Sequence, residues 1–114
     1  MKRITIASCF IAALLLAVGL RAQVPADAVW IDVRTPAEYA GGHLSQARSI
    51  PFDAIQVGVA GLHLAKDAPI YVYCAAGGRA EKAKQSLEAE GYTNVTNAGG
   101  LESARKLAET AGQP

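Results

Sequence analysis

The chain is poor in the side chains that build metal centres and disulfide frameworks. Its 114 residues include two cysteines and two histidines, and Cys9 and Cys74 lie far apart, so there is no Cys-x-x-Cys pair. Structural zinc sites need clustered Cys and His ligands at short spacings. We therefore predict no metal site and no cofactor, and any chemistry must come from the side chains and backbone of the chain itself.

The chain also lacks an excess of charge of either sign. Eleven basic and ten acidic residues give a formal net charge of +1. Proteins that bind nucleic acid present a basic patch or stripe, usually with a high isoelectric point. Nothing of that kind is present, so nucleic acid is not expected as a partner.

A long hydrophobic run occurs once, at the start of the chain. Lys2 and Arg3 precede the uncharged run 4–20, and Ala22 offers a small residue for cleavage. This order is typical of a secretory signal peptide. The alternative is an uncleaved membrane anchor, because the run has 17 residues and the lower limit for a spanning helix is about 17.

Cleavage after Ala22 would leave one small domain, residues 23–114. Removing 22 of 114 residues leaves 92, with eight basic and ten acidic side chains and a formal charge of −2. The segment removed contains Cys9, so Cys74 would be the single cysteine of a periplasmic or secreted protein. An odd thiol in an exported protein is either reactive or paired between chains. We expect a monomer, which meets a membrane only if the signal is uncleaved.

Cys74 lies between a predicted strand and a predicted helix. The apolar run Ile70–Tyr73 is typical of a buried strand, and 80–89 contains good helix formers. Gly77 and Gly78 tolerate a positive φ, so the loop between can point several backbone N–H groups inward. Together with the helix dipole, such groups lower the pKa of a thiol and make it nucleophilic. The alternative is an inert, buried structural cysteine.

The remaining chain alternates predicted strands and helices, which favours an α/β domain with a largely parallel sheet. Thr35 and Glu38 have capping-box spacing around Pro36, which indicates a short helix. Ligand sites in such sheets lie at the carboxyl ends of the strands, where Cys74 falls. The other predicted elements are strands at 29–33, 47–50 and 95–96, a helix capped by Asp53 that continues to Val59, a turn at 97–100 and a last helix over 101–111.

Three segments in this order resemble the rhodanese-like domain family. The segment 31–44 (IDVRTPAEYAGGHL) is similar to its N-terminal signature, 73–80 (YCAAGGRA) to its active-site loop, and Gly99-Gly100-Leu101 to the paired glycines before its last helix. The resemblance spans residues 29–108. It implies a rhodanese-like fold, with a small, mostly parallel sheet flanked by helices.

The resemblance also implies a sulfurtransferase. The Cys74 thiolate would take a sulfane sulfur from thiosulfate or a related small anionic donor. The resulting persulfide would pass that sulfur to a thiol, a protein acceptor or cyanide. Donor binding is expected from the backbone N–H groups of residues 75–79 and the Arg79 side chain. The predicted substrate-binding residues are Ala75, Ala76, Gly77, Gly78 and Arg79.

The chain departs from the family pattern in the charge of this loop. The position after the cysteine is often arginine in the family but is Ala75 here, so Arg79 is the one cation of the loop. This low charge favours a second hypothesis, a persulfide carrier or binding module with little free turnover. A third hypothesis is a thiol redox sensor, and the lack of a resolving cysteine near Cys74 in the sequence counts against it.

Three further polar residues are expected to have structural roles. Asp32 and Arg34 lie at a strand end and are expected to form a hydrogen-bonded pair. His43 follows two glycines, and we expect it to fix a loop through the backbone rather than to take part in catalysis.

Overall fold

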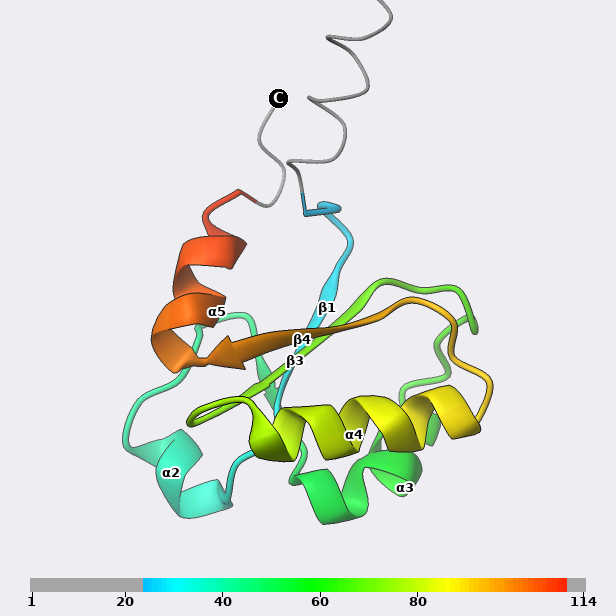
Figure 1. Ribbon diagram of the computed structural model, residues 1–114, viewed down its shortest axis with the longest axis horizontal. Helices are drawn as coiled ribbons and strands as arrows, with labels where there is room; N and C mark the ends of the chain where they lie inside the picture. The colour runs from blue at the N-terminus through cyan, green and yellow to red at the C-terminus, as the bar shows by residue number, and fades with distance from the viewer. Residues whose placement is uncertain (1–23, 111–114) are drawn as a thin grey trace, which may run out of the picture.

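A computed structural model describes residues 24–110 of the chain. The predicted signal segment 1–22 and residue 111 of the predicted last helix lie outside these residues, and that helix ends earlier than predicted, at Ala108. Four parallel strands form one sheet in the order β2-β1-β3-β4, which confirms the predicted α/β fold (Figure 1). The strands are β1 (Val29–Asp32), β2 (Arg48–Ser49), β3 (Ile70–Cys74) and β4 (Val95–Gly100).

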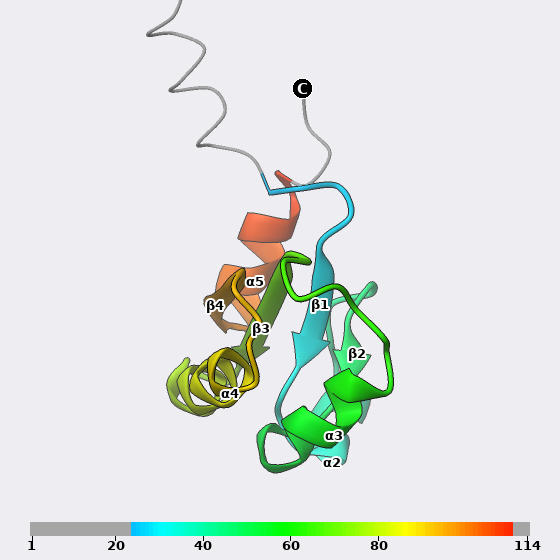
Figure 2. The same ribbon diagram turned by 90° about the vertical axis from the view of Figure 1, so that its right-hand side faces the viewer.

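Helices cover both faces of this sheet (Figure 2). Successive strand residues point to opposite faces, so each of the two central strands, β1 and β3, contributes side chains to both cores. Val72 and Cys74 of β3 face the core under α3 and α4, whereas Tyr73 faces the core beside α5. The helices are α2 (Pro36–Ala40), α3 (Ile55–Ala60), α4 (Gly78–Ala89) and α5 (Leu101–Ala108), with a 3-10 turn, η1 (Phe52–Ala54), before α3.

The start of α2 is set by its sequence, as predicted. The Thr35 side chain accepts a hydrogen bond from the Glu38 backbone N–H at 3.2 Å, and the Glu38 carboxylate accepts one from the Thr35 N–H at 3.0 Å. This reciprocal capping box, with Pro36 at the first helical position, satisfies N–H groups that a helix start leaves unpaired. Helix α2 is only five residues long, so its position depends on these caps more than on its length.

Asp53 does not cap a helix, which corrects the prediction. It lies inside η1, and α3 begins after Ala54 without a side-chain cap. The turn starts instead at Pro51, whose carbonyl accepts a hydrogen bond from Ala54 at 2.9 Å. Proline fixes the backbone at that position, and the local turn therefore forms without the aspartate side chain.

The segment 97–100 is strand rather than the predicted turn. β4 continues to Gly100, which pairs with Cys74 after a register shift between Val72 and Cys74. A glycine-rich sequence is typical of a turn, yet here the glycines allow two backbones to approach closely. This longer strand brings the end of β4 against the residues that follow Cys74.

Candidate functional site

Cys74 is the last residue of β3, and its thiol lies at the carboxyl edge of the sheet. The residue is 1% exposed and belongs to the core under α4. The loop Ala75–Gly77 then turns directly into α4 (Figure 1). Cys74 is therefore held by a buried strand on one side and by the start of a helix on the other.

The loop turns backbone N–H groups toward the sulfur, as the sequence indicated. Gly77 has a φ of +107°, a conformation that side chains rarely adopt, and its N–H donates to Cys74 Sγ at 2.9 Å. Burial raises the pKa of Cys74, but the backbone N–H groups of Ala80, Ala76, Gly77 and Arg79 together outweigh burial and lower it. The surroundings thus favour a thiolate in spite of its burial.

One N–H group of this set was missed by sequence reasoning. Ala76, Gly77 and Arg79 were among the predicted donor-binding residues, whereas Ala80 was not. Ala80 lies in the first turn of α4, where N–H groups have no helical partner. The predicted helix began at Ala80, whereas α4 begins at Gly78. A prediction with the earlier start would have placed the Ala80 N–H in the first turn and identified its contribution.

β4 supports the loop through residues that lie 20 to 25 positions away in the chain. Asn97 Nδ2 donates to the Gly77 carbonyl at 3.0 Å, and Asn97 Oδ1 accepts from the Gly99 N–H at 2.9 Å. A Cβ atom at Gly100 would lie 2.4 Å from the carbonyl oxygen of Ala75, so only glycine allows this approach. Asn97 is a supporting residue that no sequence motif had indicated.

Arg79 does not extend freely toward the thiol. Its Nη1 donates to Glu38 Oε1 at 2.7 Å, and its Nη2 donates to Glu38 Oε2 at 3.1 Å. The hydrogen bond from Arg79, with help from Thr35, lowers the pKa of Glu38 to about 2. Helix α2 thus contributes a carboxylate beside the loop, and sequence reasoning had given Glu38 only a capping role.

The Asp32–Arg34 pair fixes the segment that carries Glu38, which confirms its predicted structural role. Asp32 is fully buried and accepts from Arg34 Nη2 at 2.7 Å. The same Nη2 donates to the Gly42 carbonyl at 2.7 Å, just beyond α2. His43 Nδ1 lies 2.8 Å from the Tyr39 carbonyl, and its ring stacks on Tyr39, so His43 also holds this segment.

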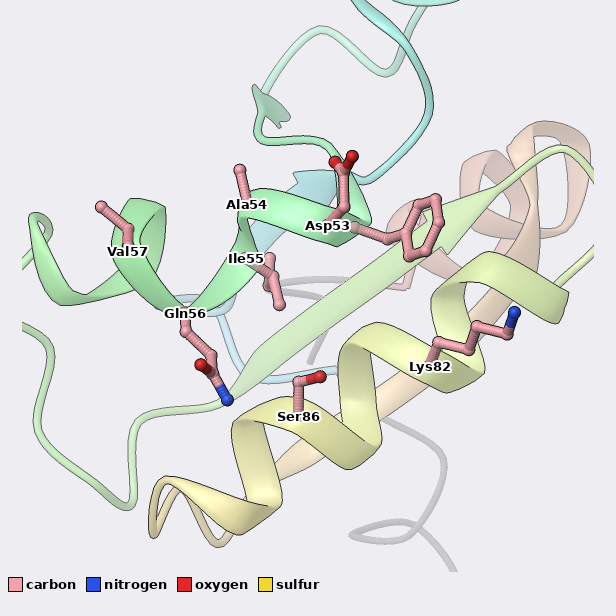
Figure 3. Close-up of a pocket in the computed structure, with 8 residues that line it drawn as sticks. Asp53, Ala54, Ile55, Gln56, Val57, Lys82 and Ser86 are labelled. Atoms are coloured by element: carbon pink, nitrogen blue, oxygen red, sulfur yellow. The ribbon is translucent and has the colours of Figure 1, made fainter.

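A pocket of about 350 Å³ lies between η1, α3 and α4 (Figure 3). Lys82 and Ser86 line it from α4, opposite Asp53 and Gln56. Lys82 Nζ lies 5.9 Å from the centre of the Phe52 ring, on this side of α4. Cys74 and the loop residues do not line the pocket, so the thiol and the pocket are separate features.

Residues 24–110 contain neither a cluster of candidate metal ligands nor a candidate membrane-spanning helix. No group of three or more His, Cys, Asp and Glu side chains there could hold a metal ion. Within the same residues, no helix has the length and apolar character to cross a membrane.

Comparison with known proteins gives a consistent family assignment. The model of the rhodanese-like domain matches residues 17–106. The chain is 40% identical over 89 residues to the thiosulfate sulfurtransferase PspE of Escherichia coli K12, covering 76% of this chain and 86% of that protein. It is 34% identical over 71 residues to a sulfurtransferase of Allochromatium vinosum, covering 62% of this chain and 64% of that protein.

The solved structures agree with these relatives. An E. coli rhodanese with bound anions superposes with a TM-score of 0.64 at 39% identity, covering 67% of this chain and 89% of that one. A different kind of relative, the tRNA uridine(34) hydroxylase of Erwinia tasmaniensis, is 37% identical, but the match covers only 25% of its length. Together the relatives support a sulfurtransferase.

Proposed function

The chain belongs to the rhodanese-like domain family, and on this premise we propose that Cys74 carries a sulfane sulfur as a persulfide. The observation that supports this proposal most strongly is the set of backbone N–H groups directed at Sγ, among them that of Gly77 at 2.9 Å. Such groups stabilise a thiolate before the reaction and a negatively charged terminal sulfur after it. The same loop geometry therefore suits both states of the cysteine.

The first half-reaction is a displacement at sulfur. The Cys74 thiolate attacks the outer sulfur of thiosulfate, a new S–S bond forms, and the original S–S bond breaks. Sulfite leaves with the bonding electron pair, and the persulfide retains the negative charge of the thiolate. In the second half-reaction a thiol or cyanide attacks the outer sulfur and releases the Cys74 thiolate. Covalent catalysis in two steps predicts ping-pong kinetics.

The donor is held by the loop in this proposal. The N–H groups of Ala76, Gly77, Arg79 and Ala80, which lower the pKa of Cys74, would hold the transferred sulfur, with Ala75 and Gly78 as further predicted contacts, and the α4 dipole adds partial positive charge there. N–H groups of Arg79 that Glu38 does not use remain for an anionic donor, because a guanidinium has five.

A persulfide carrier is the second candidate function. It is favoured by the ion pair of Arg79 with Glu38, which reduces the net charge available to attract free thiosulfate. A carrier would accept sulfur at Cys74 but release it mainly to a partner protein. The two functions share the nucleophile and differ in turnover with small molecules.

Steady-state kinetics with thiosulfate and cyanide test the proposal. We expect the wild-type protein to produce thiocyanate with ping-pong kinetics and the Cys74→Ser variant to produce none, because a hydroxyl in this loop is not ionised. Thiocyanate production by the Cys74→Ser variant would overturn the mechanism. Persulfide formation without multiple turnovers would favour the carrier.

We further propose that the protein is exported, to the periplasm or to the medium, after cleavage near Ala22. The support is the order of charges, apolar run and small residue in segment 1–22. The intact mass of the protein recovered from the exported fraction reports the cleavage site. A mass that includes residues 1–22, recovered with membranes, would support an anchor instead.

A further inference from the structure

The one cation of the active loop is already bound to a carboxylate. Arg79 donates through Nη1 and Nη2 to the two oxygens of Glu38, at 2.7 and 3.1 Å. Two parallel charged hydrogen bonds of this kind fix the orientation of the guanidinium. The Arg79 and Glu38 side chains are 30% and 36% exposed, so solvent and small anions reach the pair.

Glu38 is held in place independently of Arg79. Its Oε1 accepts hydrogen bonds from the Thr35 N–H at 3.0 Å and the Thr35 hydroxyl at 3.1 Å. Arg34 anchors the far end of the same segment through the Gly42 carbonyl. With its pKa lowered to about 2, Glu38 is ionised at neutral pH. The carboxylate is thus a permanent, well-positioned negative charge beside the loop.

The consequence concerns the charge of the donor. The pair has no net charge, so the attraction for an anion comes mainly from backbone N–H groups and from the helix dipole, which is worth about half a unit charge, and the unused N–H groups of Arg79 add hydrogen bonds without a net charge. A dianion such as thiosulfate is repelled by Glu38 twice as strongly as a monoanion in the same position. The site therefore treats donors of different charge more equally than a loop with a free arginine would.

We propose that Glu38 is a specificity-determining positioning residue, which acts through Arg79 and lowers the preference of the Cys74 site for dianionic sulfur donors over donors of lower charge. This inference rests on the proposed function. It assigns the site to donors with one negative charge or none, such as organic thiosulfonates and persulfides, as well as to thiosulfate.

The test compares two donors in the wild-type protein and in the Glu38→Gln variant. Thiosulfate is a dianion and methanethiosulfonate is a monoanion, and both transfer one sulfur to Cys74, releasing sulfite and methanesulfinate respectively. Glutamine can still accept the Thr35 hydrogen bonds, since capping boxes use either residue. The readout is kcat/KM for each donor, which reports the donor half-reaction in ping-pong kinetics.

We expect Glu38→Gln to raise kcat/KM for thiosulfate more than for methanethiosulfonate. The ratio of the two values should rise by about two- to fivefold, the effect of one unit charge at a partly exposed site. Glu38→Asp keeps the charge and should retain the wild-type ratio. Glu88→Gln is the matched control, because it removes the same charge from a pair with Lys84. Glu88 lies more than two turns after Arg79 on α4, so this variant should not change the ratio.

Each outcome decides between a charge effect and a packing effect. An unchanged or lower ratio in Glu38→Gln, with sulfur transfer intact in the wild type, would overturn this inference alone. A ratio in Glu38→Asp that shifts as far as in Glu38→Gln would assign Glu38 a purely structural role and overturn it too. A wild-type protein that takes sulfur from neither donor would overturn the proposed function as well.

Discussion

Cys74 is a buried thiol in which two effects on its pKa oppose each other. Burial disfavours the thiolate, and in an apolar core that effect alone would make the cysteine inert. Four backbone N–H groups outweigh the effect of burial, and the pKa of Cys74 is below that of an ordinary cysteine. The lowered pKa of Cys74 therefore depends on the backbone conformation of its loop rather than on a neighbouring cationic side chain.

The rate of alkylation by iodoacetamide tests this balance at the residue scale. Only the thiolate reacts, so the rate should fall as the pH decreases through the pKa of Cys74. We expect the midpoint to lie below the value of about 8.5 for a free cysteine. The unfolded protein in denaturant is the control, and its midpoint should be close to that value. A midpoint above 8.5 in the folded protein would mean that burial outweighs the N–H groups.

The element that makes this site is the β3–loop–α4 unit, held from the side by β4. The sequence predicted the unit well, because an apolar run, two glycines and a helix-forming stretch follow one another within 20 residues. It predicted the role of β4 poorly. The local sequence around Asn97 and Gly100 is typical of a turn, and only parallel pairing of β4 with β3 brings these residues to the loop.

The contact of Gly100 with Ala75 gives a prediction at the element scale. In Gly100→Ala the new Cβ would lie 2.4 Å from the Ala75 carbonyl oxygen, so the loop must move. We expect sulfur transfer to fall at least about tenfold, with a loss of stability of about 1–3 kcal/mol. Initial rates and thermal unfolding measure the two effects.

Gly61→Ala is the matched control for this substitution. Its Cβ would meet nothing closer than 3.5 Å, and Gly61 has an ordinary helical conformation at the end of α3. This variant should keep both the rate and the melting temperature of the wild type. Full activity in Gly100→Ala would show that the loop tolerates displacement and does not need the support of β4.

The same limit of local sequence reasoning applies to Glu38. Thr35, Pro36 and Glu38 identify a helix start, and the structure confirms it. The spacing of 41 positions between Glu38 and Arg79 carries no such signal. Glu38 therefore has two roles, capping α2 and pairing with the cation of the loop, and only the fold shows the second.

At the scale of the whole molecule, a small all-parallel sheet gathers three distant segments at one edge. Glu38 follows β1, Cys74 ends β3, and Asn97 and Gly100 lie in β4, so the site is completed only when the sheet has formed. The two buried cores on either side of the sheet hold these strands. With two excess acidic residues predicted after cleavage, we expect recognition of an anionic donor to depend on this local arrangement and not on net charge.

The most direct test of the central claim is the intact mass of the protein before and after incubation with thiosulfate. We predict a gain of one sulfur atom per chain, removed again by cyanide, because the loop around Cys74 stabilises a persulfide. The Cys74→Ser variant should gain nothing under the same conditions. An unchanged mass in the wild type, or a gain that persists in Cys74→Ser, would contradict the account.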